Sequence, residues 1–326
     1  GDFFYDGEGC YLLPDLTDFH AHIFSAGSEI GVHCDAFMLP QGVTTAVDAG
    51  SAGIVNMPGF LAEMRHSVTN IRAFINLAPE GLVTIRFGEN IDPKYWDVSR
   101  LGYFLENYPA AIKGLKIRLD AHVAGHNGEV ILQRAVEAAE RLHTKLVVHI
   151  SGMNLPVEVL TNTLRPGDVI AHCYHKNGSG ILDETGKLYS CVPKAQKRSI
   201  IFDAANGRVH WNLEVERRAM EQGFYPDIIS TDVVACSAWR LPVFGLPLIM
   251  SRYAALGMPF IDVIKAASFM PKQVLGEVWD GIKIGNLANF ALMKWQDRCI
   301  TVGDCSGNTM ELNKVLTNLF TVCNGN

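Results

Sequence analysis

Two histidines separated by one residue, His20 and His22, are the sharpest chemical feature of this sequence. In an extended strand, residues two apart point to the same side, so both imidazoles can reach one metal ion. The pair is a weak signal alone, because about 0.4 such matches arise by chance in a chain of this histidine content. A polar pair at the end of a strand is the plain alternative. The pair becomes informative only if other ligand-type residues join it.

Four more titratable residues stand at or near the C-terminal ends of other apolar, β-rich runs. They are Lys116 after Ile112–Leu115, His149 after Leu146–Val148, His172 after Val169–Ala171, and Asp232 after Ile228–Thr231. In a (β/α)8 barrel the C-terminal ends of all strands converge at one mouth, where active sites are built. A single buried histidine is usually a satisfied core residue, whereas a set at equivalent positions indicates a shared site. We therefore predict one metal site at the mouth of a barrel.

Lys116 needs its own explanation, because it lies between Leu115 and Ile117, where a charged and unpaired ammonium is costly to bury. One interpretation is a lysine that extends its charged end from the barrel rim into solvent. The other is reaction of the neutral amine with CO2, which gives an anionic carbamate whose two oxygens can bridge two divalent ions. Burial lowers the pKa of a lysine and so favours the neutral amine that this reaction requires.

The elements that must position these residues alternate along the chain. The β-rich runs are Leu12–Phe19, Thr44–Asp48, Ile71–Leu77, Ile112–Leu119, Lys145–Ile150, Asp168–His172, Ser199–Asp203 and Asp227–Ser230. The segments with a helical period are Met57–His66, Trp96–Asn107, Glu129–His143, Pro156–Thr163, Trp211–Gln222 and Pro242–Leu256. In the segment Glu129–His143, apolar residues recur every three or four positions, as one buried helical face requires.

Eight strands that alternate with helices over about 250 residues are typical of an α/β protein built as a (β/α)8 TIM barrel. A doubly wound open sheet is the rival architecture, but no GxGxxG follows an early strand. We predict that residues 13–285 form the barrel and that the turn-rich residues 286–326 form a C-terminal β appendage. Residues 1–12 are expected to be part of a small β-sandwich domain that is incomplete in this sequence.

Composition argues against several classes of protein. With 48% hydrophobic and 19% charged residues, the sequence is that of a globular protein with a large core. No run of about 18 uninterrupted apolar residues predicts a membrane span, and the net charge of −6 offers no basic stripe for nucleic acid. The eight cysteines include no CxxC pair, which indicates reduced thiols. We expect a cytoplasmic protein that binds neither nucleic acid nor a membrane.

Several segments form one ordered pattern along the chain. They are Pro14–His22, Gly42–Thr45, Lys116, His149, His172 and Ser230–Asp232. This pattern resembles the amidohydrolase superfamily of metal-dependent hydrolases. The phrases Val47–Gly53 and Gly114–Arg118 are similar to its amidohydrolase/deacetylase branch, which is related to dihydroorotases and D-aminoacylases. The likeness covers nearly the whole chain, from about Gly9 to Leu292.

The resemblance implies a pair of divalent cations, with zinc the first candidate. The ligands would be His20, His22 and Asp232 for the more buried ion, His149 and His172 for the second, and a CO2-derived carbamate on Lys116 between them. Two such cations lower the pKa of a bridging water and polarise the substrate carbonyl. The metal-bridged hydroxide would attack, and Asp232 would act as general base and then general acid toward the leaving group. The alternative role for Asp232 is a helix N-cap.

The sequence departs from the family pattern in two places. Members usually have glycine where Asp15 stands, in the turn before the first barrel strand. They also have a longer N-terminal β-sandwich segment than the few residues present here. The first departure is compatible with a turn, and the second indicates that the small β domain is incomplete in this numbering.

Residues near the predicted mouth bear on the substrate. Arg118, two positions beyond Lys116, is able to hold a substrate carboxylate bidentately, although a surface salt bridge explains it equally well. Tyr174 and His175 follow His172 and are expected to line the pocket. The other histidines follow no strand end and are left out of the predicted site: His33, His66, His122, His126, His143 and His210.

We therefore expect a hydrolase that cleaves the acyl bond, amide or ester, of a small carboxylate-bearing substrate, as a deacetylase does. A dihydroorotase-like cyclic amidohydrolase is the alternative, because the same ligands serve both reactions. A mononuclear deaminase on this barrel would not need Lys116. A non-catalytic barrel that acts as a binding or assembly module would be expected to have lost ligands. The expected partner is a small-molecule substrate, and association into a homo-oligomer stays open.

Overall fold

Seven parallel strands form the central sheet of the molecule. The structure is a computed structural model that describes residues 4–279 and 281–325. The strands are β2 (Leu16–Ala21), β3 (Val43–Ala49), β4 (Asn70–Asn76), β5 (Ile112–Arg118), β6 (Lys145–His149), β7 (Val169–Ala171) and β8 (Ile201–Asp203). Each strand pairs with the next one along the chain, and every pair is parallel. The C-terminal ends of all seven strands therefore meet on one side of the sheet.

An irregular segment, residues 228–233, closes this sheet into a barrel. Ile228 forms a parallel bridge with Asp203 of β8, and Val233 forms one with Ala21 of β2. Between these bridges the backbone leaves the extended conformation, because Asp232 has a φ of 51°. The strand predicted over Asp227–Ser230 is thus a bridging segment rather than a regular strand. The predicted (β/α)8 architecture is confirmed.

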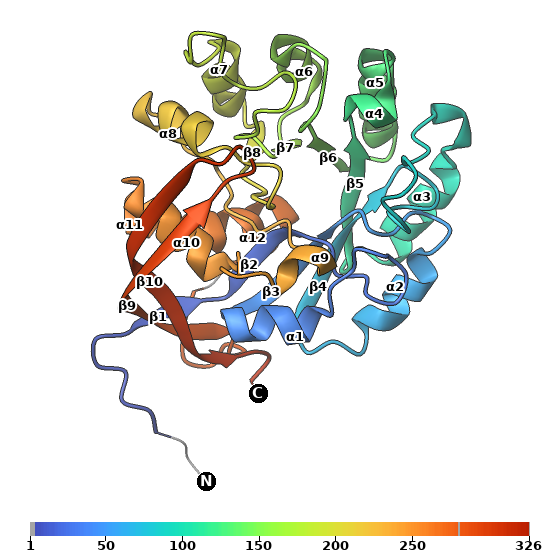
Figure 1. The fold of residues 1–326 in the computed structure, drawn as a ribbon. Coiled ribbons are helices and arrows are strands. Elements are labelled where there is room, and N and C mark those ends of the chain that lie inside the picture. Colours follow the sequence, from blue (N-terminus) through green and yellow to red (C-terminus); the bar gives the residue numbers. More distant parts are fainter. Residues whose placement is uncertain (1–3, 280, 326) are drawn as a thin grey trace.

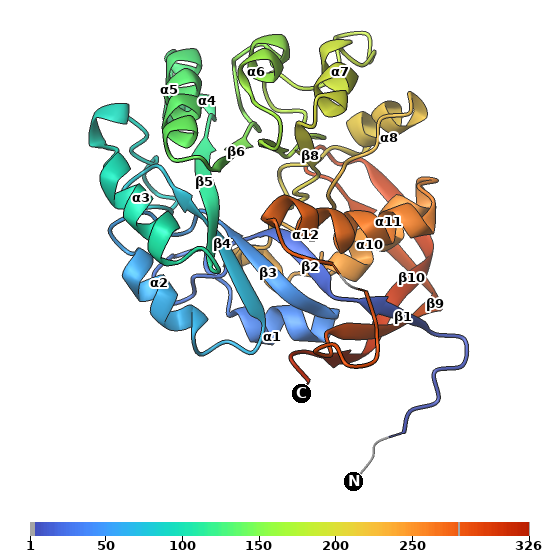
Figure 2. The ribbon, with the colours of Figure 1, turned by 180° about the vertical axis from the view of Figure 1, so that it is seen from behind.

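Helices cover the outside of the barrel, as Figures 1 and 2 show from opposite sides. The longer ones are α2 (Met57–Met64), α3 (Val98–Asn107), α5 (Gly128–Arg141), α6 (Val157–Thr163), α7 (Cys191–Lys197), α8 (Leu213–Glu221), α10 (Leu246–Ala255), α11 (Phe260–Ala267) and α12 (Phe269–Leu275). Shorter turns of helix are α1 (Cys34–Met38), η1 (Leu39–Gln41), η2 (Pro93–Tyr95), α4 (Ala121–Ala124) and α9 (Ala235–Ala238). Among the residues that the structure describes, none of these helices has the length and apolar character needed to cross a bilayer.

The sequence predicts the centres of these helices better than their ends. In α5 the buried side chains include Ile131 and Ala135, as the period indicated, and the helix stops just before His143, whose φ is 49°. The helix predicted from Pro242 begins only at Leu246, because Gly245 occupies the N-cap position in an extended conformation. The helices α7, α11 and α12 were not expected from the hydrophobic period.

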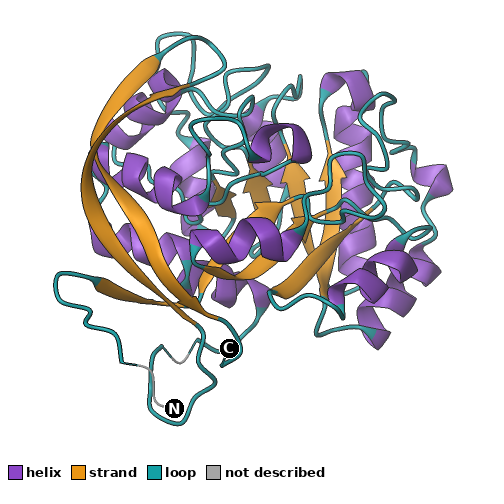
Figure 3. Ribbon diagram, turned by 60° about the horizontal axis from the view of Figure 1, so that its bottom comes forward, coloured by secondary structure: helices purple, strands orange, loops and turns teal. Residues whose placement is uncertain are grey.

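A second, antiparallel sheet lies beside the barrel. It consists of β1 (Tyr11–Pro14), β9 (Phe290–Gly303) and β10 (Thr309–Val322), with β9 in the middle. Figure 3 shows the long, twisted β9–β10 hairpin along one edge of the molecule. The hairpin packs on α10, where the Leu316 amide donates to the Ser251 hydroxyl at 2.8 Å. Residues from both ends of the chain thus share one small sheet, and β1 extends two residues past the expected boundary at residue 12.

Asp15, the residue that departs from the family pattern, lies at the N-terminal end of the barrel, opposite the mouth. Its carboxylate accepts hydrogen bonds from the hydroxyls of Thr44 at 2.5 Å and Thr45 at 3.0 Å. It also pairs with the Lys272 ammonium of α12 at 2.9 Å. Lys272 pairs in turn with Glu277 at 3.1 Å. A carboxylate at this position therefore ties the first two barrel strands to the last helix.

Candidate active site

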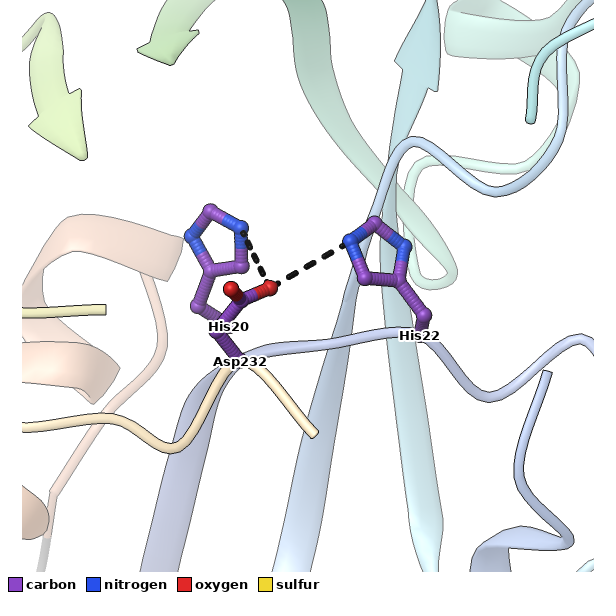
Figure 4. A group of neighbouring side chains, drawn as sticks. All are labelled: His20, His22 and Asp232. Carbon is purple, nitrogen blue, oxygen red and sulfur yellow. Dashed lines mark ion pairs between the residues drawn. The ribbon is translucent and has the colours of Figure 1, made fainter. Parts of the chain in front are cut away.

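Strand β2 and the closing segment bring His20, His22 and Asp232 together (Figure 4). Asp232 Oδ1 lies 3.7 Å from His20 Nε2 and 3.4 Å from His22 Nε2. One ligand atom from each residue can be chosen so that all three lie within 4.8 Å of one another, as a shared metal ion requires. The Asp232 amide also donates to the His20 carbonyl at 2.6 Å, which fixes the closing segment on β2.

Lys116 on β5 reaches the same place from the opposite side. Its Nζ lies 3.2 Å from His20 Nε2, and the residue is only 4% exposed. Gly50 makes room for it, because a Cβ at this position would lie 2.7 Å from Lys116 Cγ. Burial lowers the pKa of Lys116 to about 8, although the carboxylates of Asp232 and Glu89 act in the opposite direction. The neutral amine, which reaction with CO2 requires, is therefore a minor form near neutral pH, but a far more populated one than in an ordinary lysine.

His149 is the last residue of β6, and His172 directly follows β7. Their ring centres lie 4.2 Å apart. His172 Nδ1 lies 2.7 Å from the Ala205 carbonyl and His149 Nε2 lies 3.0 Å from the Ser151 carbonyl. We assign the proton to these nitrogens, since a carbonyl can only accept. The other ring nitrogen of each then keeps its lone pair, and His172 Nε2 is buried without a partner. Burial lowers the pKa of both histidines well below its usual range, so they stay neutral, as metal ligands must be.

Two left-handed backbone positions occur within this group. His172 has a φ of 68° and Asp232 a φ of 51°, which a non-glycine residue adopts at a cost on the order of 1 kcal/mol. The hydrogen bonds to Ala205 and from Asp232 to His20 hold both residues in place. Strain that surrounding contacts maintain is characteristic of functional sites.

Two buried carboxylates, Asp203 and Asp48, lie next to His20 and His22. Asp203 Oδ2 lies 3.3 Å from His20 Nδ1, and burial raises the pKa of Asp203 to about 7. Asp48 accepts from the Ser51 amide at 2.7 Å, and the Ser51 hydroxyl lies 2.9 Å from His22 Nδ1. Such outer partners fix the tautomer and ring direction of a ligand histidine. The sequence analysis missed Asp48 and Asp203, although each stands at the end of a predicted strand.

His210 also lies in this group, although it was left out of the predicted site. Its ring centre is 4.9 Å from that of His149 and 4.5 Å from that of His172. Its Nε2 lies 3.9 Å from Asp232 Oδ2. The loop between β8 and α8 carries it, and no strand end or helical period marks a residue in such a loop. The sequence feature that could have indicated His210 was its position in a loop directly after a barrel strand.

Arg118 lies at the rim of the mouth, paired in register with His149. Its Nη2 is 3.1 Å from Asp120 Oδ2, and its Nη1 is 3.7 Å from Glu89 Oε2. The side chain is 29% exposed, and its buried Nε has no partner. Arg118 therefore has carboxylate partners within the protein, as the salt-bridge interpretation requires, and its contact with a substrate stays a prediction.

Tyr174 packs into the core, and His175 lies beside a cavity. The Tyr174 hydroxyl donates to the Phe224 carbonyl at 3.2 Å, and its ring packs against Tyr253 in the core. The expected substrate contact of Tyr174 finds no support in this placement. His175 is buried beside a cavity of about 300 Å³ that Arg218 also lines. Burial lowers the pKa of His175 to about 4.

The donor set fits a pair of divalent metal ions. Four imidazoles, one carboxylate and one buried lysine converge, and each predicted ligand is 6% exposed or less. The partnerless lone pair of His172 is the clearest sign, because a buried polar atom without a partner is unfavourable unless something binds it. Imidazole and carboxylate ligands suit zinc, manganese and iron alike.

Comparison with known proteins places this site in context. No protein-family model matches the chain. A deacetylase of Brucella anthropi is 31% identical over 324 residues, which cover 97% of this chain and 79% of the relative. A deacetylase of Agrobacterium fabrum is 29% identical over 321 residues, which cover 97% of this chain and 78% of the relative.

Two solved structures share the fold. An adenine deaminase superposes with a TM-score of 0.91 at 25% identity, over 97% of this chain and 86% of its own. A dihydroorotase superposes with a TM-score of 0.91 at 29% identity, over 97% of this chain and 85% of its own. These relatives differ in activity, so the likeness identifies a family and not a substrate.

Proposed function

This chain belongs to the amidohydrolase superfamily and is a hydrolase, and from that premise we propose that it cleaves the acyl bond, amide or ester, of a small carboxylate-bearing substrate. The observation that carries the proposal is the convergence of six donor groups from five segments of the chain at one barrel mouth. The deacetylase names of two relatives, at 31% and 29% identity, support an acyl substrate.

The ligand assignment follows from the groups described above. One divalent ion would be held by His20, His22 and Asp232, and a second by His149 and His172. A carbamate on Lys116 would bind both ions. Zinc is our first choice of metal. When bound, such ions supply acidity to water and polarise the acyl carbonyl.

The protein's own residues then handle the proton. Asp232 accepts it from the attacking water and returns it to the leaving nitrogen or oxygen. The carboxylate is suited to this role because Oδ1 faces the two histidines of β2 while Oδ2 points away from them toward His210. The surrounding imidazoles contribute no competing proton, since burial lowers the pKa of His20, His149 and His172 well below its usual range.

Arg118 supports a substrate that carries a carboxylate. It lies at the mouth and keeps part of its side chain exposed. A guanidinium binds a carboxylate through two parallel hydrogen bonds. Dihydroorotase-like opening of a cyclic amide is the second candidate, because a dihydroorotase superposes on this chain with a TM-score of 0.91.

The compartment we propose is the cytoplasm. All eight cysteines are free thiols, and burial raises the pKa of Cys34 and Cys173, which keeps both unreactive. Free thiols in this number are typical of a reducing environment.

Metal content per chain is the test of this proposal. We would measure it by plasma mass spectrometry on protein produced with added zinc and bicarbonate, comparing the natural chain with Lys116→Ala. Lys294→Ala, at an exposed position on β9, is the matched control. We expect about two metals in the natural chain and in the control, and clearly fewer without the Lys116 carbamate. The metal-loaded protein would then be screened against acylated amino acids, acylated hydroxy acids and cyclic ureides.

The other outcomes are equally informative. One metal per chain, unchanged by Lys116→Ala, would replace the binuclear hydrolase with a mononuclear deaminase. Absence of metal under every loading condition would overturn the proposal and favour a binding module. Activity confined to cyclic ureides would select the dihydroorotase-like alternative.

A further inference from the structure

His210 has a place in the site but no role in the ligand set. The side chain is 21% exposed, and its ring lies beside those of His149 and His172. Its Nδ1 is buried without a partner. Its other nitrogen faces Asp232 Oδ2 at 3.9 Å. A residue that serves only to fill space would not direct a nitrogen at the carboxylate that moves the proton.

The two oxygens of Asp232 have different surroundings. Oδ1 faces His20 and His22, with which it would share a metal ion. Oδ2 faces His210 and the backbone of Gly207, where an added Cβ would lie 2.6 Å from it. A carboxylate that binds a metal through one oxygen accepts a proton more readily on the other, because the metal lowers the basicity of the bound oxygen. The direction in which Oδ2 points therefore decides whether the proton reaches the leaving group.

We propose that His210 is a positioning residue that holds Asp232 Oδ2 by donating a hydrogen bond from Nε2. The inference rests on the proposed function, since it assigns the proton transfer to Asp232. The proton must be on Nε2, because a lone pair directed at a carboxylate would be repelled. The distance of 3.9 Å is too long for a direct hydrogen bond, so the bond would form as the two groups approach when substrate binds. In this role the imidazole neither gains nor loses a proton.

Two substitutions distinguish the role of His210 Nε2 from that of Nδ1. Glutamine places its amide nitrogen near the position of Nε2, whereas asparagine reaches only to the position of Nδ1. We expect His210→Asn to lower kcat by about 10- to 100-fold with KM and metal content nearly unchanged. His210→Gln should stay within a few-fold of the natural chain. His66→Asn, at an exposed position after α2, is the control and should have no effect.

A second measurement on the unmodified, metal-loaded protein does not depend on activity. Nitrogen-15 spectra of the histidine side chains, with His210 assigned by its absence in His210→Gln, report which nitrogen carries the proton. We expect the Nε2–H form; the Nδ1–H form would overturn the proposal. So would equal loss of kcat in both variants, a change in KM alone, or loss of metal in His210→Asn, which would make His210 a ligand. If the natural chain binds two metals yet hydrolyses none of the screened compounds, the proposed function fails while the spectra still decide the tautomer.

Discussion

At the scale of single residues, the proposed mechanism depends on the direction in which the Asp232 carboxylate points. Asp232 sits in a left-handed backbone conformation, with Oδ1 toward the histidines of β2 and Oδ2 toward His210. Gly207 passes directly beneath it in a conformation, φ 50°, that glycine adopts without strain. Its amide donates to the Thr231 carbonyl at 2.8 Å, so the two loops are locked together.

Gly207→Ala should therefore damage catalysis more than stability. The new Cβ would lie 2.6 Å from Asp232 Oδ2 and would displace it. We expect kcat to fall by at least about 10-fold, since a displacement of 1 Å at a catalytic group can cost about 100-fold. The strained backbone should lower the free energy of unfolding by roughly 1 kcal/mol. Kinetics and urea unfolding of the metal-loaded protein measure the two effects.

Gly223→Ala is the matched control for this prediction. Gly223 has a φ of 80°, so alanine is strained there too, but a Cβ would meet nothing within 4 Å. The control should lose a similar amount of stability and keep its kcat. If both variants lose activity equally, backbone strain and not the clash with Asp232 is responsible.

The sequence could locate some of these groups and not others. Residues at strand ends, such as His149 and Lys116, were selected because parallel strands must end together. Asp203 followed the same rule and was overlooked, since an aspartate after a strand is also a common turn residue. His210 followed no rule, because the conformation of a loop depends on contacts that the local sequence does not contain.

At the scale of elements, a buried ion pair joins two outer helices to the loop that carries the site. Arg252 of α10 pairs with Glu216 of α8 at 2.9 Å, and both side chains are 1% exposed or less. The same guanidinium contacts the Asn206 side chain and lies 4.0 Å from the Trp211 ring centre. Asn206 immediately precedes Gly207, so the helices on the outside of the barrel support the loop beneath Asp232.

Breaking this pair should destabilise the protein strongly. Arg252→Met leaves the Glu216 carboxylate buried without its cation, which typically costs about 3–5 kcal/mol. Combining it with Glu216→Met should cost much less than the sum of the two single changes, because no unpaired charge then remains. Urea unfolding of the two single variants and the double variant gives the coupling energy.

The exposed pair on the same helix provides the comparison. Arg217 and Glu214 lie 2.5 Å apart at the surface of α8, with 56% and 35% of their side chains exposed. Arg217→Met should change the free energy of unfolding little. Additive effects in the Arg252 and Glu216 series would contradict the interpretation of that pair as one unit.

Helices and strands were predictable where the same pattern of buried contacts recurs along the element, and less predictable where that pattern is interrupted. The period of Glu129–His143 reflects a helix that rests on the sheet along its whole length, and α5 has nearly those bounds. The segment at Asp227–Ser230 is apolar like a strand, yet Thr231 just beyond it bonds to the Asp18 side chain, its amide at 2.9 Å. That contact ends the strand, and it joins residues too distant in the chain for a local pattern to reveal.

At the scale of the whole molecule, a network of ion pairs holds together the end of the barrel opposite the mouth. Glu277, which follows α12, pairs with Arg72 of β4 at 2.5 Å, Lys113 of β5 at 3.2 Å and Lys272 at 3.1 Å. Burial alone would raise the pKa of Glu277, but Arg72 and Lys272 outweigh it and lower the pKa to about 2. Because Lys272 also pairs with Asp15, this network connects the first strand of the barrel to its last helix.

Stability should fall as this carboxylate is protonated. The pKa of Glu277 is lower in the folded protein than its ordinary value of 4.5, so its contribution is complete above about pH 5 and is lost as the pH falls toward 2. The shift corresponds to at most about 3 kcal/mol. We expect the difference in unfolding free energy between the natural chain and Glu277→Gln to shrink over this interval, measured by urea unfolding at each pH. Glu311→Gln, at an exposed position on β10, should show no such change, and a difference independent of pH would contradict the role of Glu277.

The closure of the barrel has a consequence for the protein during its synthesis on the ribosome. Asp18 and Thr231, which bond across the closing seam, are 213 positions apart in the chain. At ordinary rates of translation the ribosome needs about 10 to 40 s to add that much polypeptide. During this interval the histidines of β2 have left the ribosome while the carboxylate that completes their site has yet to be made. Under the proposed ligand assignment, tight metal capture must therefore wait until the last barrel segment emerges, and the nascent chain offers only a weak, incomplete site to competing metals.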